Sequence, residues 1–190
     1  MNTPLAKEAR PHLLDSQDLG GHLDRLYRAA WALCGSREDA EDLGQETLAH
    51  VLRRPRALRN DDDLAYLFRA LRNTFISGRR AAARRPRAAA VDPEQLDLAD
   101  SGATDPLIAA RTREILAAID GLPAEFRETL VAIDVAGLTY DEAATALRVR
   151  GGTIASRLFR ARDQVARELS AKAKPVRAPE RPCCKERIPA

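Results

Sequence analysis

Residues that could catalyse a reaction are sparse in this chain, and their spacing argues against an enzyme. Asp42, Glu46 and His50 recur at steps of four, which places three possible metal ligands on one face of a helix. A di-iron bundle needs a Glu-x-x-His motif from each of two helices, and the chain has 3 His and no such motif. It also has no glycine-rich phosphate loop and no nucleophile elbow. We therefore expect no catalytic residue, metal or cofactor, and a helical metalloenzyme stays only as an alternative.

A second set of polar residues suits a nucleic-acid surface. Four arginines, a tyrosine and an asparagine share one side of a predicted helix. On single-stranded nucleic acid, cations track the backbone, aromatic rings stack on unpaired bases at roughly 1–3 kcal/mol each, and an amide reads a base edge. The alternative is a solvated helix face with the tyrosine half-buried. The residues are Tyr66, Arg69, Arg72, Asn73, Arg79 and Arg80.

A third set lies on the last predicted helix, whose buried stripe begins with Ile154, Leu158 and Ala161. Polar and aromatic side chains project away from this stripe, early in the helix, where a recognition helix contacts base edges. We therefore expect contact with DNA, whereas an uncharged outer face would indicate a packing motif only. The projecting residues are Ser156, Arg157, Phe159 and Arg160.

Apolar periodicity places the first two sets on three helices that close one small core. The first helix ends near Gly35. Ser36, with Asp39 three residues later, begins a second helix that stops before Pro55. A third helix follows the polar loop 56–62 and carries its apolar residues inward.

A second helical unit follows an acidic, proline-containing segment. Local signals start its helices, and a five-residue turn with glycines joins the last two, which is the pattern of a helix-turn-helix. These signals are the Asp105-Pro106 pair, Pro123, the Thr139 and Glu142 capping box, and Thr153.

Composition favours an all-α protein, because aromatic residues make up 4% of the 190 residues and alanine is abundant. The formal net charge of +3 hides an uneven distribution. Residues 53–87 hold 11 Arg against 3 Asp, residues 148–167 hold 6 Arg against 1 Asp, and residues 37–46 hold five carboxylates against one Arg. Arginine suits bidentate contacts to phosphate, although its excess over lysine also fits a GC-rich genome.

The cysteines and the chain ends carry little functional signal. Cys34, Cys183 and Cys184 are too few and too poorly placed for a disulfide framework, so we expect a reducing cytoplasm. The N-terminal residues do not resemble a secretory signal, and no stretch approaches the roughly 20 apolar residues of a membrane span. Two alternatives remain for Cys183 and Cys184: they form a redox or metal sensor, or they have no chemical role.

With these residues in view, the chain resembles a bacterial RNA polymerase sigma factor of the extracytoplasmic-function (ECF) group. The likeness spans about residues 19–170 and rests on four motifs in the family's order. Asp39–Thr47 resembles the polymerase-binding motif, Leu67–Ile76 the minus-10 helix, Gly121–Pro123 with Gly137–Ala144 the start of the second domain's helix-turn-helix, and Gly152–Arg162 the minus-35 recognition helix.

The resemblance implies two small helical domains. Residues 17–87 would form a region 2-like domain of three or four helices, and residues 105–171 a region 4-like helix-turn-helix domain. Residues 88–104 would be a flexible acidic linker that threads the polymerase channel, and residues 172–190 a disordered basic tail with 6 basic and 2 acidic residues.

The resemblance also implies three binding surfaces and the partners of each. The clamp coiled coil of the largest polymerase subunits would bind Asp39, Glu41, Asp42, Leu43, Gln45 and Glu46. The minus-10 strand would contact Asn60, Asp61, Tyr66, Arg69, Arg72, Asn73, Arg79 and Arg80. The minus-35 element would contact Thr153, Ser156, Arg157, Phe159 and Arg160. The polymerase flap region and an anti-sigma protein are further expected partners.

Five positions depart from the family's pattern and leave the promoter sequence open. Ala155 stands where Lys or Arg is usual, so one DNA contact is missing. Arg148 replaces a turn glycine, at a cost of about 1 kcal/mol if its φ is positive. Gly44 replaces a branched apolar residue, Tyr66 a tryptophan and Ser77 an aspartate.

The alternative function belongs to a different class of protein: a stand-alone helix-turn-helix regulator that binds duplex DNA without polymerase. It explains the C-terminal unit equally well. It leaves the acidic motif and the arginine-rich third helix unexplained.

Overall fold

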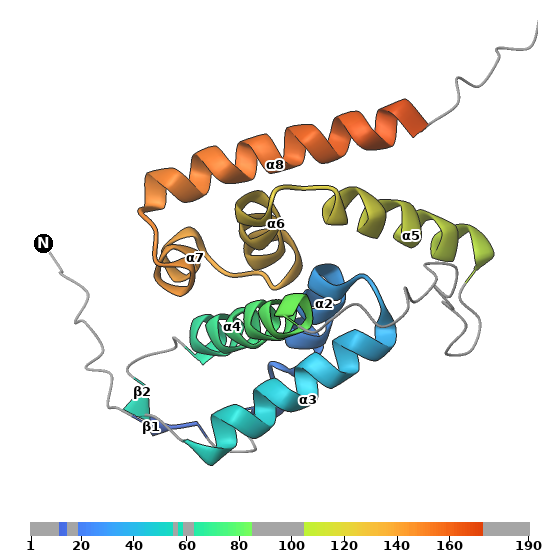
Figure 1. The fold of residues 1–190 in the computed structure, drawn as a ribbon. Coiled ribbons are helices and arrows are strands. Elements are labelled where there is room, and N and C mark those ends of the chain that lie inside the picture. The colour runs from blue at the N-terminus through green and yellow to red at the C-terminus, as the bar shows by residue number, and fades with distance from the viewer. Residues whose placement is uncertain (1–11, 15–18, 55–56, 59–62, 85–104, 173–190) are drawn as a thin grey trace, which may run out of the picture.

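The computed structural model describes residues 12–14, 19–54, 57–58, 63–84 and 105–172. Over these residues the chain is helical apart from one short ribbon, which confirms the all-α class (Figure 1). Several predictions fall outside the described residues: the linker 88–104, Asn60 and Asp61, Cys183 and Cys184, and nearly all of the tail 172–190.

Three helices build the first domain: α2 (Leu23–Cys34), α3 (Arg37–Arg53) and α4 (Asp63–Arg84). The predicted start of α3 is confirmed, because Ser36 Oγ accepts a hydrogen bond of 3.2 Å from the backbone N–H of Asp39. This cap satisfies one of the free N–H groups of the first turn.

The core of this domain is built from the stripes that periodicity predicts. Leu67, Phe68 and Leu71 of α4 are fully buried against Leu33 of α2 and Val51 of α3. Burial of each such side chain stabilises the fold by roughly 1.5–3 kcal/mol. The opposite sides of α3 and α4 are thereby fixed as outward surfaces.

The structure also contains a short antiparallel ribbon that the sequence does not predict. The strands β1 (His12–Leu13) and β2 (Ala57–Leu58) pair with His12 opposite Leu58. Two-residue strands are too short to leave a periodic signal in the sequence.

Local signals also set most of the second domain. Asp105 Oδ1 accepts from the Leu107 N–H at 2.9 Å, and Thr139 and Glu142 form the reciprocal capping box, so both predicted caps are confirmed. The elements are α5 (Pro106–Asp120), α6 (Ala124–Leu130), the π-helical turn η1 (Val131–Val135), α7 (Tyr140–Leu147) and α8 (Gly151–Lys172).

Two details differ from the sequence-based expectation. The helix that starts after Pro123 widens into η1, where the Ala136 N–H bonds to the Val131 carbonyl at 2.8 Å instead of the carbonyl four residues earlier. Helix α8 begins at Gly151, two residues before Thr153.

Arg148, at the C-cap of α7, has φ 56° and ψ 45°. Its φ is positive, so this arginine adopts the left-handed conformation that the sequence comparison associates with an energetic cost.

The two domains pack against each other, and the periodicity of the sequence does not predict this contact. Helix α2 lies beside η1, and α4 lies beside α7 (Figure 1). Buried side chains of both domains belong to one continuous cluster. Helix α8 covers the far side of the second domain, and α5 packs against both α8 and α2.

Candidate nucleic-acid and protein interfaces

The acidic helix α3 presents two outward sides. Asp39, Asp42 and Glu46 line one pocket, which α4 closes with Phe75 and Arg79. Glu41 and Gln45 line a different pocket, on the α2 side. The predicted polymerase-binding residues are therefore neighbours on one helix but flank two hollows.

Leu43 differs from the other five predicted polymerase-binding residues. Its side chain is only 7% exposed and belongs to the core of the first domain. Leu43 nevertheless lines the pocket that contains Asp39, Asp42 and Glu46. It therefore anchors α3 and remains a predicted contact residue.

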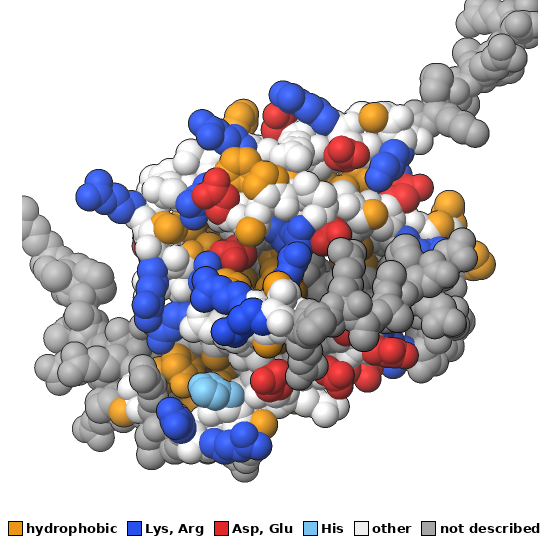
Figure 2. Space-filling view, viewed as in Figure 1, with side chains coloured by type: hydrophobic (Ala, Val, Ile, Leu, Met, Phe, Trp, Pro, Cys, Tyr) orange, Lys and Arg blue, Asp and Glu red, His pale blue; other side chains and the backbone are white. Residues whose placement is uncertain are grey.

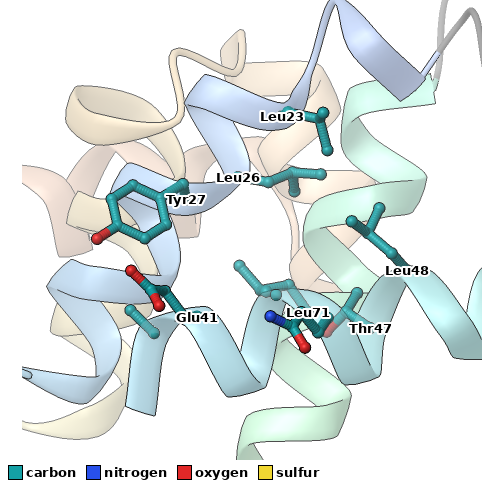
Figure 3. Close-up of a pocket in the computed structure, with 10 residues that line it drawn as sticks. Leu23, Leu26, Tyr27, Glu41, Thr47, Leu48 and Leu71 are labelled. Carbon is teal, nitrogen blue, oxygen red and sulfur yellow. The ribbon is translucent and has the colours of Figure 1, made fainter. Parts of the chain in front are cut away.

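The pocket beside Gln45 is apolar and has a volume of about 260 Å³. Figure 3 shows Leu23 and Leu26 from α2 and Leu48 from α3 around it, with Tyr27 and Glu41 at one end. Gly44 also lines it, and a Cβ built there would meet nothing within 4 Å. The missing side chain at Gly44 helps to leave this hollow open.

The structure brings only part of the predicted arginine, tyrosine and asparagine cluster of α4 together: Tyr66, Arg69 and Asn73 share one cleft, whereas Arg79 lines the acidic pocket. The Arg69 guanidinium lies over the Tyr66 ring at 5.6 Å from its centroid, and Arg79 lies over Phe75 at 5.7 Å. Such cation–π pairs hold a cation and a ring on the same surface. Arg79, Arg80 and Asn73 are exposed, and Tyr66 and Arg69 are half-buried.

Residues beyond the predicted set share this surface. A polar cleft of about 430 Å³ brings Tyr66, Arg69 and Asn73 together with His50 and Arg54 of α3. Arg148 of the second domain lines the same cleft. Sequence reasoning missed His50, Arg54 and Arg148 because they lie outside α4. The only available signal was the local excess of basic residues around positions 53 and 148.

Arg72, another predicted minus-10 residue, forms an ion pair with the second domain. Its Nε donates to Glu128 Oε2 of α6 at 2.6 Å, and the two side chains are 25% and 12% exposed. Arg72 therefore faces the second domain in this structure.

Helix α8 offers a separate surface on the far side of the second domain. Phe159 is 74% exposed, and Ser156 and Arg160 are exposed beside it. Thr153 is half-buried, and its carbonyl accepts from Ser156 Oγ at 3.0 Å. A large aromatic ring this exposed contributes little to the fold, so its position fits contact with a partner.

Arg157 lies on the inner edge of this surface. Its Nη2 donates to Glu125 Oε2 of α6 at 2.7 Å, and its side chain is 25% exposed. One turn further on, Arg162 makes a two-point ion pair with Asp134, which raises the pKa of Arg162 above its already high value. These arginines hold α8 onto the rest of the domain.

Figure 2 shows how charge is distributed over one face of the molecule. Acidic side chains gather along the first half of α3, and arginines gather on the other side of the view, over α4 and the α7–α8 turn. Separate acidic and basic surfaces suit partners of opposite charge.

Metal ligands are not brought together in the described part of the chain. No group of three or more His, Cys, Asp or Glu residues there has the geometry of a metal site. Asp42 lines one pocket and His50 another, and Glu46 lies between them. Burial, and then the charge of Asp39, raises the pKa of the Cys34 thiol to about 12, so this cysteine is a poor nucleophile.

No helix of the described residues is both long and apolar enough to cross a bilayer.

Comparison with known proteins identifies both domains. The family model "Sigma-70 region 2" matches residues 20–85, and "Sigma-70, region 4" matches residues 112–165. The ECF RNA polymerase sigma factor SigE of Mycolicibacterium smegmatis is 36% identical over 146 residues, which is 76% of this chain. The chain spans 57% of the length of that relative.

Solved structures of similar shape point the same way. The sigma factor RpoE, in complex with the anti-sigma factor NepR from Bartonella quintana, matches with a TM-score of 0.60 and 28% identity over 82% of this chain and 96% of that one. CnrH, in complex with the cytosolic domain of CnrY, matches with a TM-score of 0.56 and 24% identity over 83% and 88% of the two chains, and shows the shared fold.

Proposed function

Because this chain belongs to the sigma-70 family of RNA polymerase sigma factors, in the ECF group, we propose that it binds core RNA polymerase and directs initiation at promoters with minus-10 and minus-35 elements. The family consists of initiation factors and not enzymes, so the metalloenzyme alternative is dropped. The proposal rests on one observation: the same chain contains an acidic helix (α3), an adjacent helix that carries cations and aromatic rings (α4), and a separate candidate recognition helix (α8).

The acidic side of α3 is the proposed polymerase contact. Five clustered carboxylates repel one another in the free chain, and an arginine-rich helix would neutralise them with charge-assisted hydrogen bonds. The apolar pocket beside Gln45 adds a surface that excludes water at the edge of this contact. The proposed contact residues are Asp39, Glu41, Asp42, Leu43, Gln45 and Glu46.

The outward side of α4 is the proposed minus-10 surface. Tyr66 offers a ring for an unpaired base, and Arg69 beside it offers a cation for a phosphate. Arg79 and Arg80 are exposed further along α4 and would extend the cationic surface toward the next phosphates, although Arg79 also lines the acidic pocket. Stacking and phosphate contacts would together offset the cost of melting the duplex, which is a few kcal/mol for each displaced base. Asn73 would read a base edge.

The exposed side of α8 is the proposed minus-35 surface, read in the major groove. Arg160 and Phe159 lie at its centre, and Ser156 and Thr153 lie toward the helix start. Arg157 would reach DNA only by leaving Glu125. Ala155 offers no hydrogen bond, which narrows recognition to fewer base pairs.

One further partner and a location follow from the family. The similar sigma factor RpoE has been solved in complex with an anti-sigma factor, so we infer a regulator of this kind here. Transcription takes place in the cytoplasm of bacteria, where the chain would act.

Promoter-specific run-off transcription with purified core polymerase tests the proposal. The wild-type chain should start transcripts at defined sites, and Gln45→Ala with Glu46→Lys should abolish both initiation and co-purification with polymerase. Gln164→Ala with Glu168→Lys makes the same two changes on α8, outside the proposed surfaces, and should leave both intact. Tight binding of free duplex without initiation would instead favour the stand-alone regulator.

A further inference from the structure

The polar cleft that holds Tyr66, Arg69 and Asn73 also receives residues of two other helices. It lies where α4 meets the end of α3 and the end of α7, and its volume is about 430 Å³. Pockets for small ligands usually measure about 300–1,000 Å³, so one small molecule fits this hollow. Beyond the proposed function, we infer that the cleft of the free chain binds a ribonucleotide with two or three phosphates.

Three arginines of the cleft lack an acidic partner among the described residues. Arg54 lies at the C-cap of α3, Arg69 on α4 and Arg148 at the C-cap of α7, and no described carboxylate forms an ion pair with them. Arg72, on the same helix as Arg69, is by contrast paired with Glu128. Guanidinium groups that are not neutralised and share one hollow attract an anion, and their planar forks match phosphate oxygens.

Arg148 reaches the cleft in a strained conformation. Its φ of 56° is positive, a region that is unfavourable for an L-residue and that glycine adopts freely. Residues held in this way cluster at ligand sites in proteins. The Arg148 side chain is exposed, so no buried packing requires an arginine at this position. A phosphate contact in the cleft gives the arginine a role that glycine could not fill.

The cleft also offers a surface for a base. The Arg69 guanidinium lies over the Tyr66 ring, 5.6 Å from its centroid. Unpaired bases stack on aromatic rings and on guanidinium planes, so this pair can hold any base. Asn73 in the same cleft is exposed, and its amide can both donate to and accept from a base edge.

Glu46 favours a ribonucleotide over DNA as the ligand of the whole cleft. It is the only carboxylate among the described residues that line the hollow. A carboxylate repels phosphates, but it accepts a hydrogen bond from the 2′-hydroxyl of a ribose, as it does in dinucleotide-binding folds. Deoxyribose lacks this hydroxyl, so a DNA strand would meet only the repulsion.

The nucleotide site overlaps the proposed minus-10 surface without being identical to it. Tyr66, Arg69 and Asn73 belong to both, so a nucleotide and a promoter strand would exclude each other there. Arg54 and Arg148 lie outside the proposed minus-10 surface and would contact only the nucleotide. Substitution of these two arginines therefore separates the two ligands.

Isothermal titration calorimetry of the full chain, without polymerase and in magnesium-free buffer, tests this binding. ATP and GTP should bind alike, because stacking accepts either base. Affinity should fall in the order ATP, ADP, AMP, because each lost phosphate removes charge-assisted hydrogen bonds with the arginines. Deoxy-ATP should bind more weakly than ATP because it lacks the 2′-hydroxyl, and inorganic triphosphate should bind more weakly because it has no base.

Arg148→Gly separates nucleotide binding from stability. The variant loses one guanidinium and its backbone strain together, so it should fold at least as well as wild type and bind ATP roughly 10-fold more weakly. Arg150→Gly is the matched control, because Arg150 is exposed in the same turn but does not line the cleft. Arg54→Ala should also weaken ATP binding, whereas Arg53→Ala, one residue earlier and outside the cleft, should not.

A fluorescein-labelled 12-nucleotide single strand of DNA provides the comparison ligand. Arg148→Gly should weaken the binding of this strand less than the binding of ATP. An equal loss for both ligands would overturn the inference, because the whole cleft would then be part of the DNA surface. Undetectable binding of ATP and GTP to the folded wild-type chain, or equal ATP affinity of Arg148→Gly and Arg150→Gly, would overturn it as well.

Run-off transcription separates these outcomes from the proposed function. A chain that initiates transcription but binds neither nucleotide refutes only the nucleotide site. A chain that binds ATP through Arg148 but never initiates transcription refutes only the proposed function.

Discussion

Replacement of Arg148 by glycine should stabilise the second domain. Arg148 holds φ 56° and ψ 45° at the C-cap of α7, a conformation that costs an L-residue about 1–2 kcal/mol. Glycine adopts it freely but loses more backbone entropy on folding, by roughly 0.5–1 kcal/mol. The Arg148 side chain is exposed, so its removal leaves no cavity. The net gain in free energy of unfolding should be about 0.5–1 kcal/mol.

Urea titration and thermal melting followed by circular dichroism measure this gain. A change of that size raises the melting temperature of a chain of this length by about 1–4 °C. Arg150→Gly is the matched control, because Arg150 is also exposed in the same turn but does not have positive φ. It should leave stability unchanged or lower it. If Arg148→Gly were no more stable than Arg150→Gly, the strain argument would be wrong.

Three further outcomes are expected. Arg160→Ala should weaken the binding of promoters that carry the minus-35 element by about 1–3 kcal/mol. Arg157→Ala should mainly lower the free energy of unfolding, because Arg157 pairs with Glu125. Equal effects of the two variants on promoter binding would contradict this division. In a chain with Cys183→Ser and Cys184→Ser, the Cys34 thiol should react with a thiol reagent at pH 8 only after unfolding. Because its folded pKa of about 12 exceeds the ordinary 9.0, its contribution to stability should be full below pH 9 and fall between pH 9 and 12; rapid reaction of the folded chain would refute the burial argument. Arg127→Met should lower the free energy of unfolding of the second domain by about 2–3 kcal/mol, because buried Arg127 donates hydrogen bonds to the Asp120 and Leu122 carbonyls. Arg111 is exposed, so Arg111→Met is the control and should be nearly neutral in the same unfolding assay.

Features that depend on local chemistry could be predicted from the sequence. The caps at Ser36, Asp105 and Thr139 form where hydroxyl or carboxylate residues precede an apolar period, and each is seen in the structure. The side of α4 that carries Tyr66 and Arg69 follows from the 3.6-residue period alone. Such features need only a few neighbouring residues to be specified.

Features that depend on contacts between distant segments could not be predicted. The Arg72–Glu128 pair joins positions 56 residues apart, and the hydrogen bonds from Arg25 to the Ala136 and Gly137 carbonyls join positions more than 110 apart. No periodic signal encodes which arginine meets which acceptor.

The arginines of the second domain show how this limit affects a functional argument. Residues 148–167 contain six arginines, and their number along the sequence suggests a strongly basic DNA surface. In the structure, three of them pair with carboxylates: Arg157 with Glu125, Arg162 with Asp134 and Arg167 with Asp163.

Only Arg148, Arg150 and Arg160 then remain for phosphates in the described part of the chain, and Arg148 sits at the cleft between the domains. Each phosphate contact contributes to the salt dependence of DNA binding, so three available cations give a weaker electrostatic attraction than six. Under the proposed function, recognition by α8 would therefore rely more on Phe159 and Arg160 at the base edges than on charge. Weak attraction to free duplex suits a protein that polymerase holds on the promoter, which favours the proposed initiation factor over a regulator that binds duplex DNA alone.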